Sequence, residues 1–491
     1  MREVSARGFS FSLGVRERIL LTLTALLTLT ACGFDVPLGF DDAGTTCGDA
    51  GLGNFRPDPT FGTCGTVALD VGALDNVVTG TQGLAVDAQG RAYLAGTTGA
   101  PIDRNIGVVR LNPDGTRDLT FGTSGVAEVS VTPADEGHGV LLQPDGTIII
   151  SGNSKTTMNE PIPVLGKLSS AGIPDINFGM SGHMKVSAVM GASGVCIGTW
   201  RRPSDGAIAC SGTAWRNYPG EGDLALVAID PNTAVPLTAY GTNGAAMIDY
   251  GFLDQNGAVA VNTADGKVLL PGSSEGPTQR DFALARLDSN GALEASFTDS
   301  RALPGRISVD FNGGDDDCRA VLPLADGSAW CVGSARLNPS AFGGAIIKVL
   351  PTGALDPSFG TNGKLTLPAF TAIWAVVELD DGRFLIGGDS ASADVAQALQ
   401  ILDANGGESS AVQTMNLSSG TDSVRQLVID AQGRVWIFGV TNGVDWSIHR
   451  WIPAGRRMMG VASDCSSAGT SVPLLLLLGA LVRRRGRTRT G

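Results

Sequence analysis

Short apolar runs separated by turn residues repeat along this chain, and residues 264–291 show one complete unit. The dipeptide Asp265-Gly266 is typical of a tight turn, because glycine tolerates the positive φ that two-residue hairpin turns require. The apolar run Lys267–Leu270 is too short for a helix and predicts a buried strand. In Phe282–Ala285 large and small side chains alternate, which suits a strand between packed sheets. The unit therefore predicts short β-strands joined by turns.

Three markers recur in seven repeats with a period of about 57 residues. The first is a Gly-x5-Gly strand, at Gly90–Gly96, Gly146–Gly152, Gly206–Gly212, Gly266–Gly272, Gly327–Gly333, Gly382–Gly388 and Gly433–Gly439. The second follows each strand and resembles RLNPDG; it begins at Arg110, Lys167, Ala228, Arg286, Lys348, Ile401 and Arg450. The third precedes each strand and resembles FGTSG; it begins at Phe61, Phe121, Phe178, Tyr240, Phe297 and Phe359. Its seventh counterpart, within residues 407–420, has lost the signature.

Each repeat offers four strand-length segments, for example Ile106–Leu111, Val126–Val131, Gly139–Gln143 and Thr147–Ile150. Four strands per repeat, without helical periodicity between them, predict a radial array of sheets. We therefore predict an all-β fold, a seven-bladed β-propeller with four strands per blade. A strand near Val67–Val71 should join the last blade and close the ring, since closure protects the sheet edges. A solenoid, the alternative architecture, would lack this closure.

The segment RLNPDGTRDLTFGTSG, residues 110–125, resembles the delta-sixty repeat, a predicted propeller family common in large bacterial secreted proteins. The resemblance covers roughly residues 56–455 and is weakest in the seventh repeat. It implies a propeller placed outside the cytoplasm. It supplies no shared catalytic residues.

The N-terminus reads as an export signal followed by a tether. Four arginines precede the apolar stretch Ile19–Ala31, a pattern typical of a signal peptide. The ending Leu-Thr-Ala-Cys resembles the bacterial lipobox, which implies lipidation of Cys32; the alternative is an ordinary signal peptide cut nearby. We therefore expect a lipoprotein-type signal peptide over residues 1–31, a tether over 32–55 and the propeller over 56–455.

Residues 456–491 form a second terminal signal. An apolar segment, Val472–Val482, lies between Cys465 and an arginine cluster. As a helix it would span about 16 Å, short of the roughly 30 Å hydrocarbon core of a bilayer. The order of these parts resembles the MYXO-CTERM sorting signal of myxobacterial surface proteins, which implies processing and anchoring at Cys465. We expect an exported protein at the outer membrane or cell surface, or released from it, with membrane attachment through the lipid, the C-terminal segment or both.

Charge and composition limit the partners. The chain has 68 glycines and a formal net charge of −13, and removing both terminal signals leaves about −20. An acidic body repels phosphate backbones, so nucleic acid is not an expected partner.

The cysteines outside the terminal signals occur in pairs. Cys196 and Cys318 lie at similar distances before the Gly-x5-Gly strand of their repeats, while Cys210 and Cys331 each lie two residues before its closing glycine. This placement predicts two cross-strand disulfides, Cys196–Cys210 and Cys318–Cys331, and leaves Cys47–Cys64 as a third. Zinc binding is the alternative, but no Cys-x-x-Cys pair or matching histidine spacing is present.

No catalytic, cofactor-binding or metal-ligating residue can be assigned from motifs. The three histidines, His138, His183 and His449, are expected on loop or strand surfaces, although a propeller channel can gather residues from separate blades. The consecutive Asp315, Asp316 and Asp317 offer carboxylates for Ca²⁺, but the spaced Asp pattern of a calcium loop is absent, and a solvated acidic loop is the favoured interpretation.

A basic series and a group of tryptophans are the remaining candidates. The cations Arg110, Lys167, Arg286, Lys348 and Arg450 share one repeat position. If that position faces the channel, they form a ligand-binding ring for an anion; the favoured alternative is that each pairs with a turn carboxylate such as Asp114. Four tryptophans, Trp374, Trp436, Trp446 and Trp451, lie in the last two repeats and suit a glycan platform or, as we favour, blade packing.

These features favour a non-enzymatic cell-surface propeller that presents loops to a protein or glycan of the envelope. One alternative is a glycan-active hydrolase or lyase with its site in the propeller channel, since propellers host such chemistry without implying it. Another is a structural spacer of the envelope. We expect no cofactor beyond the calcium considered above.

Overall fold

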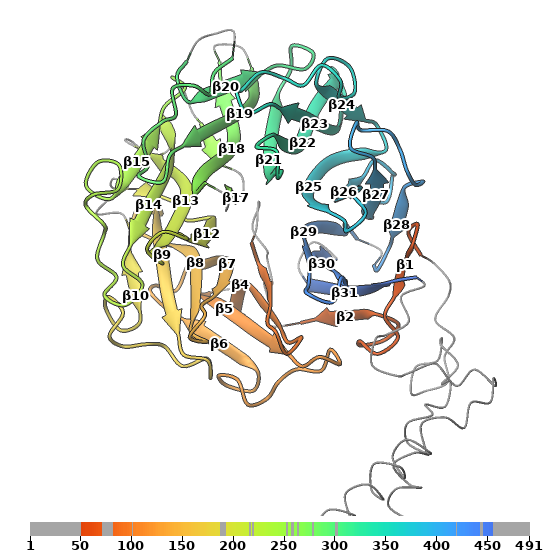
Figure 1. The fold of residues 1–491 in the computed structure, drawn as a ribbon. Coiled ribbons are helices and arrows are strands. Elements are labelled where there is room, and N and C mark those ends of the chain that lie inside the picture. The colour runs from red at the N-terminus through yellow and green to blue at the C-terminus, as the bar shows by residue number, and fades with distance from the viewer. Residues whose placement is uncertain are drawn as a thin grey trace, which may run out of the picture. The chain divides into compact units, whose positions relative to one another are not determined.

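The computed structural model describes residues 51–454, apart from gaps at 71–81, 101, 187–192, 216–217, 219, 252–253, 257–259, 263–264, 277–278, 300–302, 419 and 442–444. These residues form seven antiparallel sheets arranged as a ring, with the first strand of each sheet toward the centre (Figure 1). The fold is a seven-bladed β-propeller, as the repeats predict. Among the described residues, no helix is long and apolar enough to cross a membrane.

The blades follow one another in chain order. Blade 1 contains β3 (Leu84–Val86), β4 (Ala92–Ala100), β5 (Asp103–Leu111) and β6 (Val126–Val129). Blade 2 contains β7 (Glu136–Leu142), β8 (Ile148–Lys155), β9 (Pro161–Leu168) and β10 (His183–Lys185). Blade 3 contains β11 (Ser193–Gly194) and β12 (Gly198–Arg201), then β13 (Ile208–Trp215), β14 (Gly222–Ile229) and β15 (Ala245–Ile248). Blade 4 contains β16 (Gln255–Asn256) and β17 (Ala260–Asn262), then β18 (Lys267–Glu275), β19 (Arg280–Leu287) and β20 (Arg306–Val309).

The last three blades complete the ring. Blade 5 contains β21 (Asp316–Pro323), β22 (Ala329–Asn338), β23 (Ala341–Val349) and β24 (Lys364–Leu367). Blade 6 contains β25 (Phe370–Glu378), β26 (Phe384–Ser390), β27 (Gln397–Leu402) and β28 (Gln413–Met415). Blade 7 contains β29 (Ser423–Ile429), β30 (Val435–Thr441) and β31 (Asp445–Pro453), and its outer strands are β1 (Phe55–Pro57) and β2 (Thr66–Leu69).

The two glycines of the Gly-x5-Gly marker have different roles. The first makes the turn between the first and second strands, as at Gly146, where φ is +82°. The second lies where the first strand crosses closely: a Cβ at Gly152 would sit 2.2 Å from the Glu136 carbonyl oxygen. The marker therefore records both a turn and a close backbone approach, which explains its regularity.

Blade 7 is closed by the N-terminal segment, as predicted. β2 pairs antiparallel with β31, with Thr66 opposite His449 and Leu69 opposite Trp446. β1 also pairs with β31, and the preceding Leu52 is 3% exposed in the core between blades 6 and 7. Residues 51–55 are therefore part of the propeller and not of the predicted tether, because their apolar side chains are buried on the last blades.

The hydrophobic core lies between adjacent sheets. At the closure, Trp436, Phe438 and Trp446 of blade 7 pack with Leu94 and Val109 of blade 1. Comparable clusters join the other neighbouring blades. Because each sheet is covered on both faces, its middle strands are buried along most of their length, and their apolar runs supply the contacts between blades.

Candidate functional site

The predicted basic series is used inside the blades. Four cations pair with a carboxylate eight residues later: Arg110 with Asp118 (2.8 Å), Lys167 with Asp175 (3.5 Å), Arg286 with Glu294 (2.7 Å) and Lys348 with Asp356 (3.0 Å). Each carboxylate lies three residues before the aromatic residue of the FGTSG-like marker. The structure thus shows the local ion pairs that we favoured. The carboxylates differ from the expected Asp114, which accepts hydrogen bonds from Thr116 instead.

The fifth cation receives its carboxylate from the other end of the chain. Arg450 Nε donates to Asp58 Oδ2 at 2.7 Å, and both side chains are buried. Asp58 precedes Phe61 as Asp118 precedes Phe121, so the N-terminal segment supplies the missing half of the seventh repeat. In the third repeat the ion pair is absent, because Ala228 replaces the cation and Leu237 replaces the carboxylate. The backbone hydrogen bond from Leu237 N to the Ala228 carbonyl oxygen remains. Because the side-chain nitrogen atoms of these five cations are paired within the blades, the cations do not form the ligand-binding ring considered from the sequence.

A different set of side chains gathers at the centre of the ring. The innermost strands β7, β21, β25 and β29 each contain a β-bulge, and the extra residues are His138, Arg319, Trp374 and Arg425. Each lies 14 residues before the second glycine of its marker, and Gln82 has the same offset in the first repeat. Sequence reasoning missed this position, although its constant spacing identifies it. A bulge re-aims a side chain, so these strands present one residue each toward the axis.

Blades 5, 6 and 7 bring three of these residues into contact. The guanidinium carbon of Arg319 lies 3.8 Å from the centroid of the Trp374 ring, and that of Arg425 lies 4.1 Å from it. The two arginines come from the blades on either side of Trp374, and both lie against its indole ring. Each contact is a cation–π interaction, which strengthens when the groups are shielded from water. We call Arg319, Trp374 and Arg425 the central cluster.

The hydrogen bonds of the central cluster are unevenly distributed. Trp374 Nε1 donates to Asp389 Oδ2 at 2.8 Å, and Ser423 Oγ donates to the other oxygen of Asp389. Arg319 Nη2 donates to Ser334 Oγ at 3.2 Å. By contrast, Nε and Nη1 of Arg425 and Nε of Arg319 are buried without an acceptor in the part of the chain that the structure describes.

Burial also sets the electrostatics of the two arginines. It lowers the pKa of Arg425, an effect that Asp389 partly offsets and Arg319 reinforces. It lowers the pKa of Arg319 against the opposing charges of Asp317 and Asp389. Both guanidinium groups therefore favour an additional negative charge beside them.

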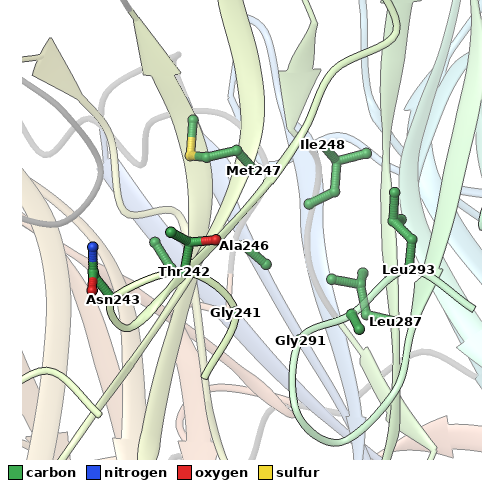
Figure 2. A pocket seen from close by; sticks show the side chains of 11 residues that line it. Gly241, Thr242, Asn243, Ala246, Met247, Ile248, Leu287, Gly291 and Leu293 are labelled. Carbon is green, nitrogen blue, oxygen red and sulfur yellow. The ribbon is translucent and has the colours of Figure 1, made fainter. Parts of the chain in front are cut away.

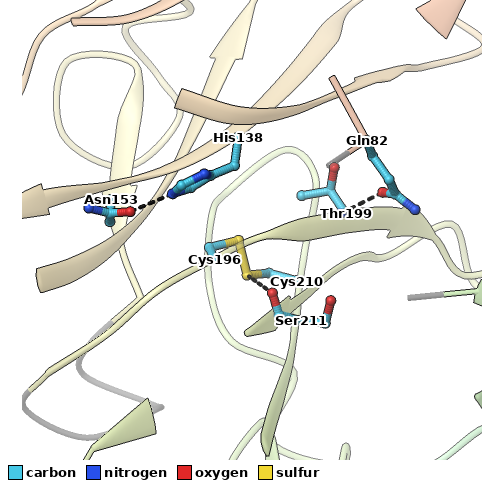
Figure 3. The surroundings of a disulfide bond; sticks show 7 residues. All are labelled: Gln82, His138, Asn153, Cys196, Thr199, Cys210 and Ser211. Carbon is cyan, nitrogen blue, oxygen red and sulfur yellow. Dashed lines mark hydrogen bonds between the residues drawn. A yellow bond between two sulfur atoms is a disulfide. The ribbon is translucent and has the colours of Figure 1, made fainter. Parts of the chain in front are cut away.

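Gln82 and His138, the residues at the same offset in the first two repeats, lie near the Cys196–Cys210 disulfide (Figure 3). The Gln82 carbonyl accepts from Val140 N, and its side-chain oxygen accepts from Thr199 N, so blade 1 is tied to blades 2 and 3. His138 is 2% exposed and its Nε2 lies 2.5 Å from Asn153 Oδ1. Burial lowers the pKa of His138.

The expectation of surface histidines is wrong for two of the three. His138 is buried by the bulge of β7, and His449 is buried because β2 covers it, its Nδ1 lying 2.9 Å from Thr66 Oγ1. Burial lowers the pKa of His449 to about 4. Only His183, on the outer strand β10, is partly exposed.

The predicted disulfides Cys196–Cys210 and Cys318–Cys331 are both formed, with Cα–Cα distances of 5.8 and 5.9 Å. Each ties the innermost strand of its blade to the second strand, and Cys318 directly precedes Arg319 of the central cluster. Cys64 is also disulfide-bonded; Cys47, its predicted partner, lies outside the described residues. Disulfides indicate an oxidising compartment outside the cytoplasm. Cys32 and Cys465 lie outside the described residues too.

The three consecutive aspartates do not form a solvated loop. Asp316 begins β21, is fully buried, and accepts from Phe311 N and Arg336 N. Asp315 and Asp317 point to other partners, Arg336 at 3.5 Å and Arg280 at 3.5 Å respectively. The stretch therefore cannot act as one calcium loop, since strand alternation separates its side chains.

Asp316 instead belongs to one of two acidic groups at equivalent repeat positions. Oxygen atoms of Asp281, Asp310 and Asp316 lie within 4.8 Å of one another, as do those of Asp223, Asp249 and Asp254. Burial raises the pKa of both Asp254 and Asp316 to about 7. Asp254 and Asp316 each accept a hydrogen bond from a backbone N–H of the loop that enters the next blade, those of Tyr250 and Phe311, so we assign these two carboxylates a structural role.

Three of the four tryptophans pack between blades, as favoured: Trp436, Trp446 and Trp451 are at most 3% exposed. Trp374 is the exception, since it belongs to the central cluster.

One groove lies away from the centre, at the outer edge of blades 3 and 4. It has a volume of about 630 Å³ and is lined by β15 residues such as Met247 and by Leu287 and Leu293 (Figure 2). No ionisable side chain lines it. Its lining mixes apolar side chains with the neutral polar side chains of Thr242 and Asn243, and it offers no charged group that would select a ligand.

Residues 90–121 and 263–297 match the family described as a domain of unknown function (DUF5122) beta-propeller. These segments lie in blades 1 and 4 and cover less than half of the chain. No curated protein matches the sequence. The resemblance to the delta-sixty repeat stays a prediction.

Solved structures with a similar fold have low sequence identity to this chain. The polysaccharide lyase Uly1 has a TM-score of 0.45 at 11% identity, covering 77% of this chain and 91% of its own. Drosophila Semaphorin 1b, extracellular domains 1-2, has a TM-score of 0.39 at 10% identity, with coverages of 77% and 88%. The soluble aldose sugar dehydrogenase of Escherichia coli has a TM-score of 0.37 at 9% identity, with coverages of 79% and 99%. The chain is thus a seven-bladed β-propeller in which two repeats match the DUF5122 β-propeller domain.

Proposed function

We propose that this protein is an exported, non-enzymatic binding protein and that its ligand site lies at the central cluster. One observation carries the proposal: three consecutive innermost strands bulge at the same repeat position and bring Arg319, Trp374 and Arg425 into contact. Elsewhere in the described chain, buried cations of the repeat are paired with turn carboxylates. A site assembled from several blades at the ring axis is a common place for a propeller to bind a ligand.

The groups around the central cluster favour binding over catalysis. A glycan hydrolase generally needs two carboxyl groups placed on either side of the scissile bond. The carboxylates nearest the cluster are engaged, Asp389 with Trp374 and Ser423, and Asp317 with Arg280 and Arg319. His138 is held by Asn153 and is buried. These contacts support a binder of an envelope glycan, displayed by the anchors that Cys32 and Cys465 predict.

The test is thermal unfolding of the oxidised protein with a panel of envelope glycans, each followed by product analysis. A ligand at a hundred times its Kd should stabilise the protein by about 2.7 kcal/mol. The same ligand should fail to stabilise Trp374→Ala, because the two arginines lose the indole that positions them. Stabilisation that survives in Trp374→Ala would move the site elsewhere. Cleaved products would establish the hydrolase or lyase alternative. A flat profile with every glycan would count against the glycan ligand and leave a protein partner or the spacer interpretation.

A further inference from the structure

We propose that the ligand of the central cluster carries an oxyanion, such as the carboxylate of an acidic sugar, and that Arg425 and Arg319 bind it. This inference names the ligand class and rests on the function proposed above. Sulfate and phosphate groups share the same chemistry, so the experiment below separates these sources.

The first reason is the set of donors. Nε and Nη1 of Arg425 are buried and have no acceptor among the residues that the structure describes, and the same holds for Nε of Arg319. A buried donor without an acceptor is unfavourable, so such groups are retained where a ligand satisfies them. The planar guanidinium fork matches the geometry of carboxylate and phosphate oxygens.

The second reason is the local charge. Asp389 already accepts from Trp374 Nε1 and Ser423 Oγ, and Asp317 lies between two cations, 3.5 Å from Arg280 and 3.7 Å from Arg319. Asp389 is therefore committed to donors other than Arg425, and Asp317 is shared between Arg280 and Arg319. An incoming oxyanion supplies the charge that Arg425 lacks.

The third reason is the position of the indole. Two guanidinium groups already lie over the Trp374 ring, with their carbons 3.8 and 4.1 Å from its centroid. A neutral sugar that binds by stacking on an aromatic face would have to displace an arginine. Trp374 is better placed to hold the two arginines at a fixed separation, and the Cys318–Cys331 disulfide fixes the backbone next to Arg319. A site held in this way loses little freedom on binding.

The experiment compares ligands that differ only in charge. Titration calorimetry of the oxidised full-length protein would use oligogalacturonate, a neutral oligogalactan of the same length, sodium sulfate and inorganic phosphate. We expect oligogalacturonate to bind, the neutral chain not to bind, and the affinity to fall with added salt. If sulfate or phosphate binds as tightly as oligogalacturonate does for each anionic group, the oxyanion assignment stands and the sugar ring adds nothing to the affinity.

Variants of the arginines give a second readout. Arg425→Ala should weaken oxyanion binding about tenfold to a hundredfold, and Arg425→Lys less, since it keeps the charge and loses the fork. Arg201→Ala is the matched control, because Arg201 is an exposed arginine at the far end of the innermost strand β12. Without ligand, Arg425→Ala should lose little stability, because removal of buried donors that lack acceptors offsets the lost cation–π contact with Trp374.

The outcomes separate this inference from the proposed function. Equal binding of the neutral chain, abolished in Trp374→Ala, would keep the central site and overturn the oxyanion. Unchanged oxyanion binding in Arg425→Ala, or a large loss of ligand-free stability in that variant, would also overturn it. Failure of the charged ligands to bind, while a neutral glycan from the earlier panel does, would have the same effect.

Discussion

Replacing Asp58 with alanine should open the seam between the two ends of the chain. Asp58 is 1% exposed and Arg450 is 2% exposed, and the two side chains meet at 2.7 Å. Asp58 also accepts from Thr60 N at 2.9 Å and Thr60 Oγ1 at 2.7 Å, which holds the turn before β2. Removing one partner of a buried pair leaves the other charge uncompensated, at a cost of about 3–5 kcal/mol. We expect Asp58→Ala to lose about that much free energy of unfolding.

The matched control is Asp118→Ala, which breaks the equivalent pair with Arg110 inside one blade. Urea unfolding should show similar losses for both variants, since chemistry and burial are alike. Hydrogen exchange should differ: Asp58→Ala should expose β1, β2 and β31, and Asp118→Ala should expose β5 and β6. A loss below about 1 kcal/mol for Asp58→Ala, against the range expected for a buried pair, would refute the reasoning. The same exchange pattern in both variants would refute it too.

Three further predictions follow from burial and the disulfides. His449 has a pKa of about 4 in the fold, below its ordinary value, so the free energy of unfolding should fall by about 3 kcal/mol as the pH drops from about 6.5 to 4. In urea titrations, His449→Gln should show a smaller decrease over the same pH range. Asp254 has a pKa of about 7 in the fold, above its ordinary value, so the free energy of unfolding should fall as the pH rises from about 4 to 7 and the buried carboxyl loses its proton. Asp254→Asn should therefore have a higher melting temperature than the wild type at about pH 8 and the same melting temperature at about pH 4. Replacing either cysteine pair with serine should cost about 3 kcal/mol, given loops of 14 and 13 residues, measured by urea unfolding. Only Cys318→Ser/Cys331→Ser should also weaken ligand binding, because Cys318 adjoins Arg319; equal affinity in both double variants would contradict this.

The fold could be predicted because its signals are local and repeated. Turn glycines and apolar runs identify the four strands of a blade, and the extra marker at Phe61 indicated that a strand was available to close blade 7. The ion pairs were harder, since a cation at a fixed position does not reveal whether it faces solvent. The carboxylate that pairs with each cation lies three residues before the aromatic residue of the FGTSG-like marker. This pairing becomes apparent only when the cation and the carboxylate positions are compared across several repeats.

The central cluster was not predicted, for a physical reason. A β-bulge adds one residue to a strand and shifts the two-residue alternation of side chains, so a search for alternating strands misses it. Only the constant offset of the position from the second marker glycine signals it. The residue at this offset also differs from repeat to repeat: it is histidine, arginine or tryptophan at the bulges and glutamine in the first repeat, so no shared residue type marks the position. Trp374 therefore looked like the other tryptophans of the last blades, which pack in the core.

The closure of blade 7 has a consequence for the order of folding. Asp58 and Arg450 are 392 residues apart, so β1 and β2 have no partner until the last strand has been synthesised. Before that, the blades form a linear stack in which each contacts only its neighbours, and such arrays fray from their ends. The late pairing of β1 and β2 with β31 joins the first and last blades, so the closed ring has no terminal blade from which to fray. A nascent chain halted before β31 would thus be folded in its middle blades but open at its edges, and completion of the final strand would set the moment at which it becomes resistant to proteases.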